Sequence, residues 1–290
     1  MNRLTASEPS VIKRLGPRFL AVSLLFWLTP VASVYSATGM DMPGMDMEAA
    51  ASYEKLTKEQ LLDILSRSSE TAPANLYSKD LTGLDLSGVN FRGANLTASL
   101  MNRANLSKAN LSHCNLTVSF AEGANLSHAN LQGAMMFSMQ LKGSDLTGTN
   151  LSGARFIGDL RGANLQGANM TKMDGAVDTK NQSMGLMRAS IVSANLQGAD
   201  LSGADFSKAD FSFSTLAGVN LTGANLFNAD LSGADFSKAN LSRANLREAK
   251  IIDTDFTGAN LTDADFTGAE LRGVKGLDKA SAEKAKGLPR

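Results

Sequence analysis

A bulky apolar residue recurs at every fifth position through most of this chain, and no other feature limits its possible folds as strictly. Leu or Phe occupies positions 76, 81, 86, 91 and 96, and the same frame returns from position 196 to position 246. An α-helix repeats every 3.6 residues and a strand every two, so neither accounts for this spacing. A short fixed period indicates a solenoid, in which each unit buries its apolar side chain by packing on its neighbours.

Two more positions of each unit keep the same rhythm. A small residue stands two positions before each bulky one, and Asn or Asp stands directly before it. A narrow coil has room inside for one large and one small apolar group per unit, so we expect these two positions to face inward. The core predicted on this basis includes Leu96, Leu106, Leu111, Leu126, Leu201, Phe206, Leu221, Leu226, Ala94, Ala204 and Cys114.

The unit Ala-(Asn/Asp)-Leu-X-X resembles the motif of the pentapeptide-repeat family, as in Ala-Asn-Leu-Thr-Ala at 94–98 and Ala-Asp-Phe-Ser-Lys at 204–208. The resemblance implies an all-β fold, a right-handed quadrilateral parallel β-helix with one unit per side and four sides per coil. The frame from 76 to 271 then makes about ten coils, and at about 4.8 Å between parallel strands the rod is about 48 Å long. Short helical caps are expected at each end, because open ends expose unpaired backbone groups.

The first 36 residues have the features of a secretory signal peptide. Lys13, Arg14 and Arg18 precede an apolar run of 11 residues at 19–29, which is followed by Pro30 and a stretch of small residues. This run is shorter than the roughly 20 residues that span a membrane. We therefore expect an exported member of the family, periplasmic or secreted, with no stable membrane insertion after the signal is removed. The cleavage site stays open, and an uncleaved anchor is the alternative.

The remaining chain divides into four parts. A flexible Met-rich segment is expected at 37–55, a capping helix at 56–73, the β-helix at 74–275 and a C-terminal cap at 276–290. Thr57 and Gln60 predict a capping box for the first helix, and a shorter helix is expected from Leu277 to Lys286. The five-residue rhythm fails at 171–188, which is either an irregular coil or a loop that leaves the rod.

The Met-rich segment is the one candidate for metal chemistry. Met40, Met42, Met45 and Met47 alternate with Asp41, Asp46 and Glu48. Thioether sulfur favours Cu(I) and carboxylates suit Cu(II), so copper is the possible cofactor; a low-complexity spacer is the alternative interpretation. A weaker site that combines His113 with Met135 is also conceivable, although His113 and His128 are both explained as solvated residues at outward positions.

Several function classes are excluded by composition. Without residues 1–36 the chain has 24 basic and 27 acidic side chains, a balance that gives no patch for binding nucleic acid. One cysteine and two histidines make neither a disulfide framework nor a zinc site. No arrangement of nucleophile, base and orienting residue is present, so we expect no enzymatic activity.

We therefore expect a scaffold that presents a rigid surface to a protein or cell-envelope partner, with its oligomeric state open. Copper binding or tolerance through the Met-rich segment is the alternative. Some members of the family imitate DNA and protect topoisomerases, and this is a third hypothesis. Export argues against this hypothesis. Basic residues such as Arg103 and Lys208 stand among the outward acidic ones, and they argue against it as well.

Overall fold

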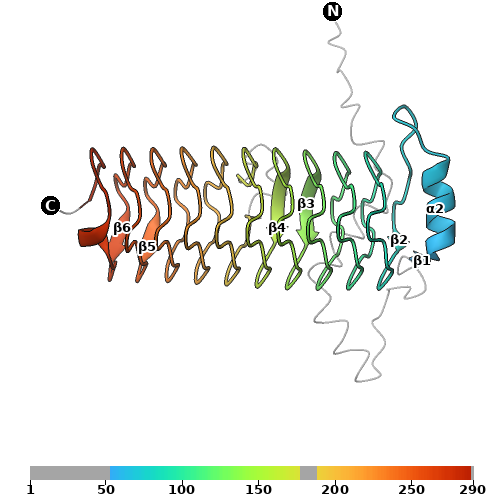
Figure 1. Cartoon of the computed structure of the whole chain (residues 1–290), viewed down its shortest axis with the longest axis horizontal. Helices are drawn as coiled ribbons and strands as arrows, with labels where there is room; N and C mark the ends of the chain where they lie inside the picture. The colour runs from blue at the N-terminus through green and yellow to red at the C-terminus, as the bar shows by residue number, and fades with distance from the viewer. Residues whose placement is uncertain (1–52, 177–187, 289–290) are drawn as a thin grey trace, which may run out of the picture. The chain divides into compact units, whose positions relative to one another are not determined.

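The computed structural model describes residues 53–176 and 188–288, and these residues form a rod of stacked coils (Figure 1). Each five-residue unit forms one side, and backbone hydrogen bonds connect each coil to the next. Leu106 N–H donates to the carbonyl of Asn125 at an N···O distance of 2.7 Å, and Asn125 N–H donates back to Ala104 at 3.0 Å. On one face, ten parallel steps lead from Asn75 to Lys286. The predicted right-handed quadrilateral β-helix is confirmed.

Corners between sides depend on residues with left-handed backbone geometry. Gly133 has φ of 63° and His113, one coil earlier at the same corner, has φ of 58°. A Cβ atom on Gly133 would lie 2.7 Å from His113 Nδ1. A large side chain at a corner therefore extends over the next coil, where glycine leaves the space that it needs.

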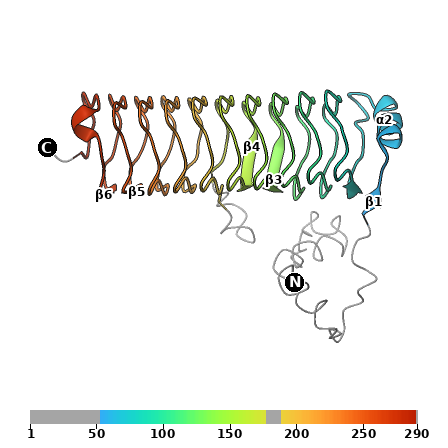
Figure 2. The ribbon, with the colours of Figure 1, turned by 60° about the horizontal axis from the view of Figure 1, so that its bottom comes forward.

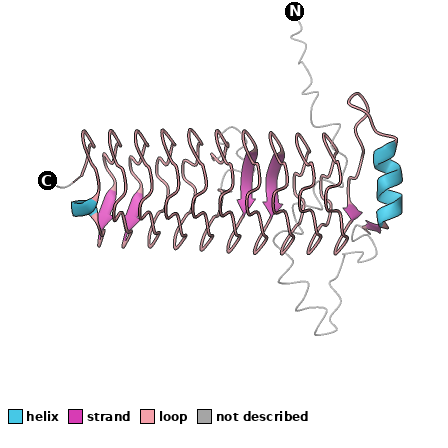
Figure 3. Ribbon diagram, viewed as in Figure 1, coloured by secondary structure: helices cyan, strands magenta, loops and turns pink. Residues whose placement is uncertain are grey.

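Most sides are too short to be drawn as strands, and Figure 3 shows them as loops. Three parallel pairs are exceptions: β1 (Glu54–Lys55) with β2 (Lys79–Asp80), β3 (Met135–Gln140) with β4 (Arg155–Asp159), and β5 (Lys250–Ile252) with β6 (Glu270–Arg272). The register of β3 against β4 shifts between Phe137 and Met139. Leu160 follows Phe156 by four residues and not five, and this shift accounts for the missing residue.

The two ends of the rod differ. Helix α2 (Lys58–Ser66) begins with the predicted capping box between Thr57 and Gln60, and its Leu61 is fully buried. At the other end, within the described residues up to 288, only a 3-10 turn, η4 (Leu277–Lys279), is helical (Figure 2). The prediction of a helix from Leu277 to Lys286 is therefore wrong beyond Lys279, because the backbone there returns to the coil and pairs with Asn260 and Asp265. No helix among the described residues has the length and apolar character of a membrane span.

The interruption of the five-residue rhythm is shorter than the expected range of 171–188. Residues 171–174 keep regular coil positions, and Asp174 pairs with both Arg155 and Asp205. The spacing between paired residues on neighbouring coils, ordinarily 20, becomes 31 from Asp174 to Asp205. The insertion therefore adds 11 residues at one corner, and the segment 177–187 lies outside the described residues.

Gly175, two residues before the segment 177–187, occupies a position that holds a large apolar side chain on neighbouring coils. Its amide donates to the carbonyl of Asp205. A Cβ atom at Gly175 would lie 2.4 Å from a ring carbon of Phe206, which is completely buried. The ring of Phe206 thus fills the space that a side chain at position 175 would need.

Candidate interaction surface

The predicted core residues all face the interior. Leu96, Leu106, Leu111, Leu126, Leu201, Phe206, Leu221, Leu226, Ala94, Ala204 and Cys114 are each no more than 1% exposed. The Cys114 thiol lies 3.0 Å from the carbonyl oxygen of Phe91, and burial raises its pKa to about 12. Since the thiolate is the reactive form, Cys114 is a packing residue.

Asn and Asp before each bulky residue hold the coils together. The Oδ1 atom of Asn105 accepts a bond from the amide of Ser107 at 3.2 Å, and its Nδ2 donates to Asp85, one coil earlier, at 2.9 Å. Asn220 repeats this arrangement with Thr222 and Asp200. These side chains therefore stabilise corners and coil stacking, which explains why the repeat requires them.

Two adjacent faces of the rod are defined by the residues at their Asn/Asp positions. The first face holds Asn75, Asn95, Asn115, Met135, Arg155, Asp174, Asp205 and Asn225. The second face holds Asp80, Leu100, Phe120, Gln140, Asp159, Ser190, Asp210, Asp230 and Lys250. Departures from the usual polar residue, such as Leu100, Phe120 and Met135, therefore lie on neighbouring faces.

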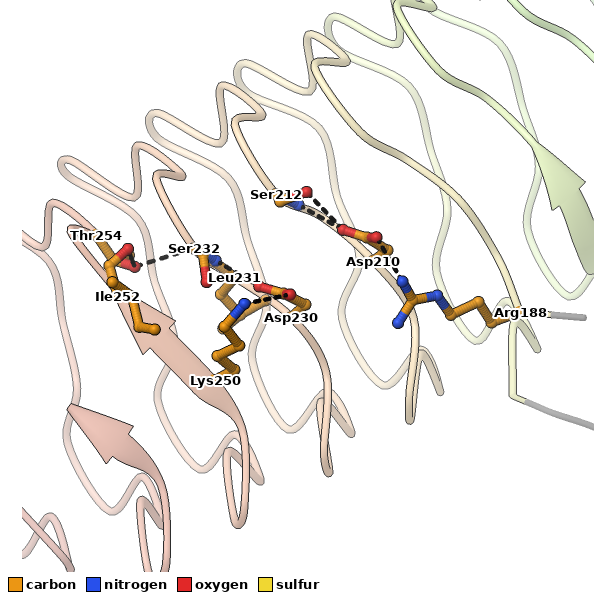
Figure 4. A network of polar contacts seen from close by, with 9 residues as sticks. All are labelled: Arg188, Asp210, Ser212, Asp230, Leu231, Ser232, Lys250, Ile252 and Thr254. Carbon is orange, nitrogen blue, oxygen red and sulfur yellow. Dashed lines mark hydrogen bonds and ion pairs between the residues drawn. The ribbon is translucent and has the colours of Figure 1, made fainter. Parts of the chain in front are cut away.

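Paired charges line the second face where it follows the insertion (Figure 4). Asp210 accepts bonds from Arg188 Nη2 at 2.8 Å and Ser212 Oγ at 2.6 Å, and Lys250 Nζ lies 3.1 Å from Asp230 Oδ2. Desolvation works to raise the pKa of Asp230, but bonds from Ser232 and Lys250 outweigh it and lower that pKa. Each of these two stacked carboxylates thus has its own cation, so the pair is suited neither to a metal nor to acid–base chemistry.

Both histidines stand at corners between sides of the coil. His113 extends over Gly133, and a Cβ on Gly148 would lie 2.6 Å from His128 Nδ1. Met135 is 45% exposed on the first face. Within 53–176 and 188–288, no group of three or more His, Cys, Asp or Glu side chains could hold a metal ion. The candidate ligands Met40, Met42, Met45 and Met47 lie outside the described residues.

An apolar cluster extends from the first face to the edge that this face shares with the second, and we call it the apolar edge: Leu100, Val118, Phe120, Met135, Phe137 and Ile157. All six hold outward positions. Leu100 pairs with Phe120 on the next coil, Val118 N–H donates to the carbonyl of Phe137 at 2.7 Å, and Phe137 pairs with Ile157. The cluster therefore lies on four stacked coils and includes residues of β3 and β4.

The apolar edge differs from the core in its accessibility. Met135 is exposed, Leu100, Val118, Phe120 and Phe137 are partly exposed, and Ile157 is buried. The guanidinium of Arg155 lies 4.9 Å from the centre of the Phe137 ring, and its Nη1 forms an ion pair with Asp174. Arg, Met and aromatic residues are the types enriched in the buried centre of protein interfaces.

Sequence analysis considered Met135 only as a possible metal ligand and did not find the apolar edge. The signal was present, because Leu100 and Phe120 stand where the repeat has Asn or Asp, and Phe137 stands where it has Ser or Thr. Seeing that these residues meet requires the stacking period of 20 residues and the register of β3 on β4. Phe213, an exposed side chain at another corner, was also missed.

Comparison with protein families identifies one match. The family described as pentapeptide repeats matches in eight copies, and the matched ranges overlap to cover residues 80–174 and 186–275, which is more than half of the chain. No curated protein matches the sequence.

Solved pentapeptide-repeat structures are similar at modest identity. HetL, involved in heterocyst differentiation regulation in the cyanobacterium Nostoc sp. strain PCC 7120, is 26% identical; the match covers 80% of this chain and 94% of HetL with a TM-score of 0.46. Full-length QnrB1, a plasmid-mediated fluoroquinolone resistance protein, is 23% identical over 68% of this chain and 92% of its own, with a TM-score of 0.34. Rfr23 from the cyanobacterium Cyanothece 51142 is 26% identical over 39% and 86%, with a TM-score of 0.24.

Proposed function

Because this chain belongs to the pentapeptide-repeat family, we propose that it is a non-catalytic scaffold, exported to the periplasm or secreted, that presents its β-helix to a protein or cell-envelope partner. The apolar edge is the observation that carries this proposal. Its six apolar side chains stand at repeat positions where most other coils have polar residues. Apolar clusters at outward positions of a protein mark surfaces that bind a partner.

The rigidity of the rod supports the same role. Phe120 and Phe137 stand on coils that are bonded to neighbours above and below along the whole of their sides. A partner that binds there meets side chains already held in place, so little conformational entropy is lost on binding. The apolar run at 19–29 supports export.

The charge arrangement argues against imitation of DNA. A DNA mimic needs an excess of unpaired negative charge along one face. On the second face Asp210 is paired with Arg188, Asp230 with Lys250, and Asp159 with Arg161 at 2.5 Å. These pairs cancel the negative potential that topoisomerase protection of this kind requires.

Fractionation and crosslinking test the proposal. Cells that express the full chain with a C-terminal tag should yield a periplasmic or secreted protein that lacks about the first 36 residues, as measured by intact mass. A photo-crosslinking residue in place of Met135 should then capture the same envelope component in repeated preparations. Intracellular protein of full mass would defeat the proposed export, and the lack of any reproducible crosslink would defeat the scaffold role at this surface.

We also propose, as a second function, that the Met-rich segment binds copper. Four thioethers interleaved with three carboxylates at 40–48 support it, because soft sulfur suits Cu(I) and carboxylates suit Cu(II). Mature protein should bind Cu(I) more tightly than a variant that lacks residues 39–48, measured by competition with a chromogenic chelator. Equal weak affinity for the two proteins would end this proposal.

A further inference from the structure

The last coil of the rod departs from the repeat at the position of the large apolar residue. On three of its sides this position holds a small residue where other coils have Leu or Phe: Gly276, Ala282 and Gly287. Leu271, on the remaining side, keeps the usual size. A further coil stacked on this one would find no large side chain to pack against on those three sides, so the apolar core ends here.

The backbone of the last coil leaves the extended conformation at its two glycines. Gly276 and Gly287 have φ of 74° and 76°, and no other described residue at this repeat position has a positive φ. A Cβ atom on Gly276 would lie 2.4 Å from the amide nitrogen of Thr257, and one on Gly287 would lie 2.5 Å from the carbonyl carbon of Phe266. The chain therefore bends against the preceding coil at these two points and offers no extended edge there.

Apolar side chains close the core at this end. Leu277 and Leu288 directly follow the two glycines, and both are half-buried against the core. Phe256, Leu261 and Phe266 are the last large residues of their sides, and all three are fully buried. The end of the core is thus covered by residues of the last coil itself, whereas helix α2 packs at the other end of the rod.

The two remaining sides of the last coil are short edges that carry charge. Glu270 and Arg272 of β6 are exposed on either side of Leu271. On the opposite side of the same coil, Glu283 and Lys284 are exposed. Charged side chains on a short edge strand oppose pairing with the strand of another chain. These two sides are therefore also poor places for further stacking.

We propose that residues 270–288 form a terminating coil, which prevents a second copy of the protein from stacking end to end on the rod. A regular coil at this end would present four extended sides and an open apolar core, and both favour such stacking. Glycine on two sides and charge on the other two remove these features. The inference goes beyond the proposed scaffold function, because it concerns the end of the rod and leaves the long sides to the partner.

Sedimentation velocity of the purified mature protein tests the proposal. In the exchanged variant, a copy of residues 230–249, which form a regular coil, replaces residues 270–290. This variant should form faster-sedimenting species whose share rises with protein concentration, and the parent protein should not. In the control, the same copy is inserted between Ala249 and Lys250, so the rod gains a coil and keeps its terminating coil. The control should sediment as one species, as the parent does.

The outcomes decide the proposal whether or not the exchanged coil folds, which circular dichroism establishes. A folded exchanged variant that associates no more than the parent or the control overturns it. For an unfolded one, Arg272→Thr with Glu283→Thr takes its place, and should associate more than the parent at high concentration, while Arg247→Thr with Glu248→Thr on an interior coil should not. Equal sedimentation of these two variants would then overturn the proposal. The crosslink at Met135 tests the scaffold role separately.

Discussion

Replacing Gly175 with alanine should destabilise the rod, although nearly all of the remaining coils have a large apolar residue at this position. The added Cβ would lie 2.4 and 2.5 Å from two carbons of the Phe206 ring. Ordinary carbon contacts are about 3.5–4.0 Å, so the ring must move by about 1 Å. Phe206 is fully buried and packs edge-on against Phe211 with ring centres 5.3 Å apart, which leaves little room for such a shift.

Overpacking of this kind costs about 1–3 kcal/mol. For a unit of this size each kcal/mol corresponds to a fall of about 2–4 °C in the melting temperature. Thermal and urea denaturation followed by far-ultraviolet circular dichroism should therefore show a clear loss for Gly175→Ala. Tryptophan fluorescence is unsuitable, because the single Trp27 lies in the predicted signal peptide.

A second substitution distinguishes steric conflict from a general weakness at this corner. Phe206→Leu in the Gly175→Ala background should restore part of the lost stability, so the double variant should be more stable than the sum of the two single losses predicts. Ser207→Ala, beside Phe206 and outward, should stay within about 0.5 kcal/mol of the parent. A Gly175→Ala protein as stable as the parent, or strictly additive losses, would refute the steric explanation.

Three individual contacts give further predictions. Because the pKa of Asp230 is lowered in the fold, its ion pair with Lys250 stabilises the protein above the unfolded pKa of about 3.9 and loses this effect as the pH falls below it. Asp230→Asn should therefore cost under about 1 kcal/mol of folding stability at pH 7. The difference in melting temperature between this variant and the parent should disappear near pH 2. Cys114, whose pKa is raised to about 12, should react with a thiol reagent only in denaturant, and rapid labelling of the native protein would contradict its burial. Gly133→Ala should lower stability by about 1 kcal/mol through its left-handed backbone and its contact with His113, with partial recovery in a His113→Gly background; an unchanged melting curve would count against the corner rule.

Much of the fold could be predicted from the sequence, because burial in a narrow coil permits few residue types. Leu96 and Cys114 stand at repeat positions that specify the large and small inward places, and both are buried there. The capping box of Thr57 and Gln60 is a local motif and could be recognised directly. The C-terminal segment was harder, since Leu277 to Lys286 has helix-forming residues and yet pairs with the preceding coil beyond η4. Tertiary pairing outweighs local preference there.

The candidate surface was less accessible to sequence reasoning. Each outward apolar residue, such as Phe137, is unremarkable alone, and the cluster arises only when residues 17 to 20 positions apart are brought together. The position of the insertion also depended on register, because Thr171 and Asp174 depart little from the motif and belong to the regular coil. The shortened side at β4, visible in the sequence as one residue lost between Phe156 and Leu160, sets the alignment of every later coil.

Disulfide trapping of stacked positions is the sharpest test of the four-sided coil. In a Cys114→Ala background, cysteines at Asn105 and Asn125, which pair across neighbouring coils, should lie about 4.8 Å apart between Cα atoms and should oxidise readily to a disulfide. A protein with cysteines at Asn105 and Asn130, on adjacent faces of neighbouring coils, should remain reduced under the same conditions, as measured by mass spectrometry. Equal oxidation of both pairs, or none of the first, would contradict a coil of 20 residues with four sides.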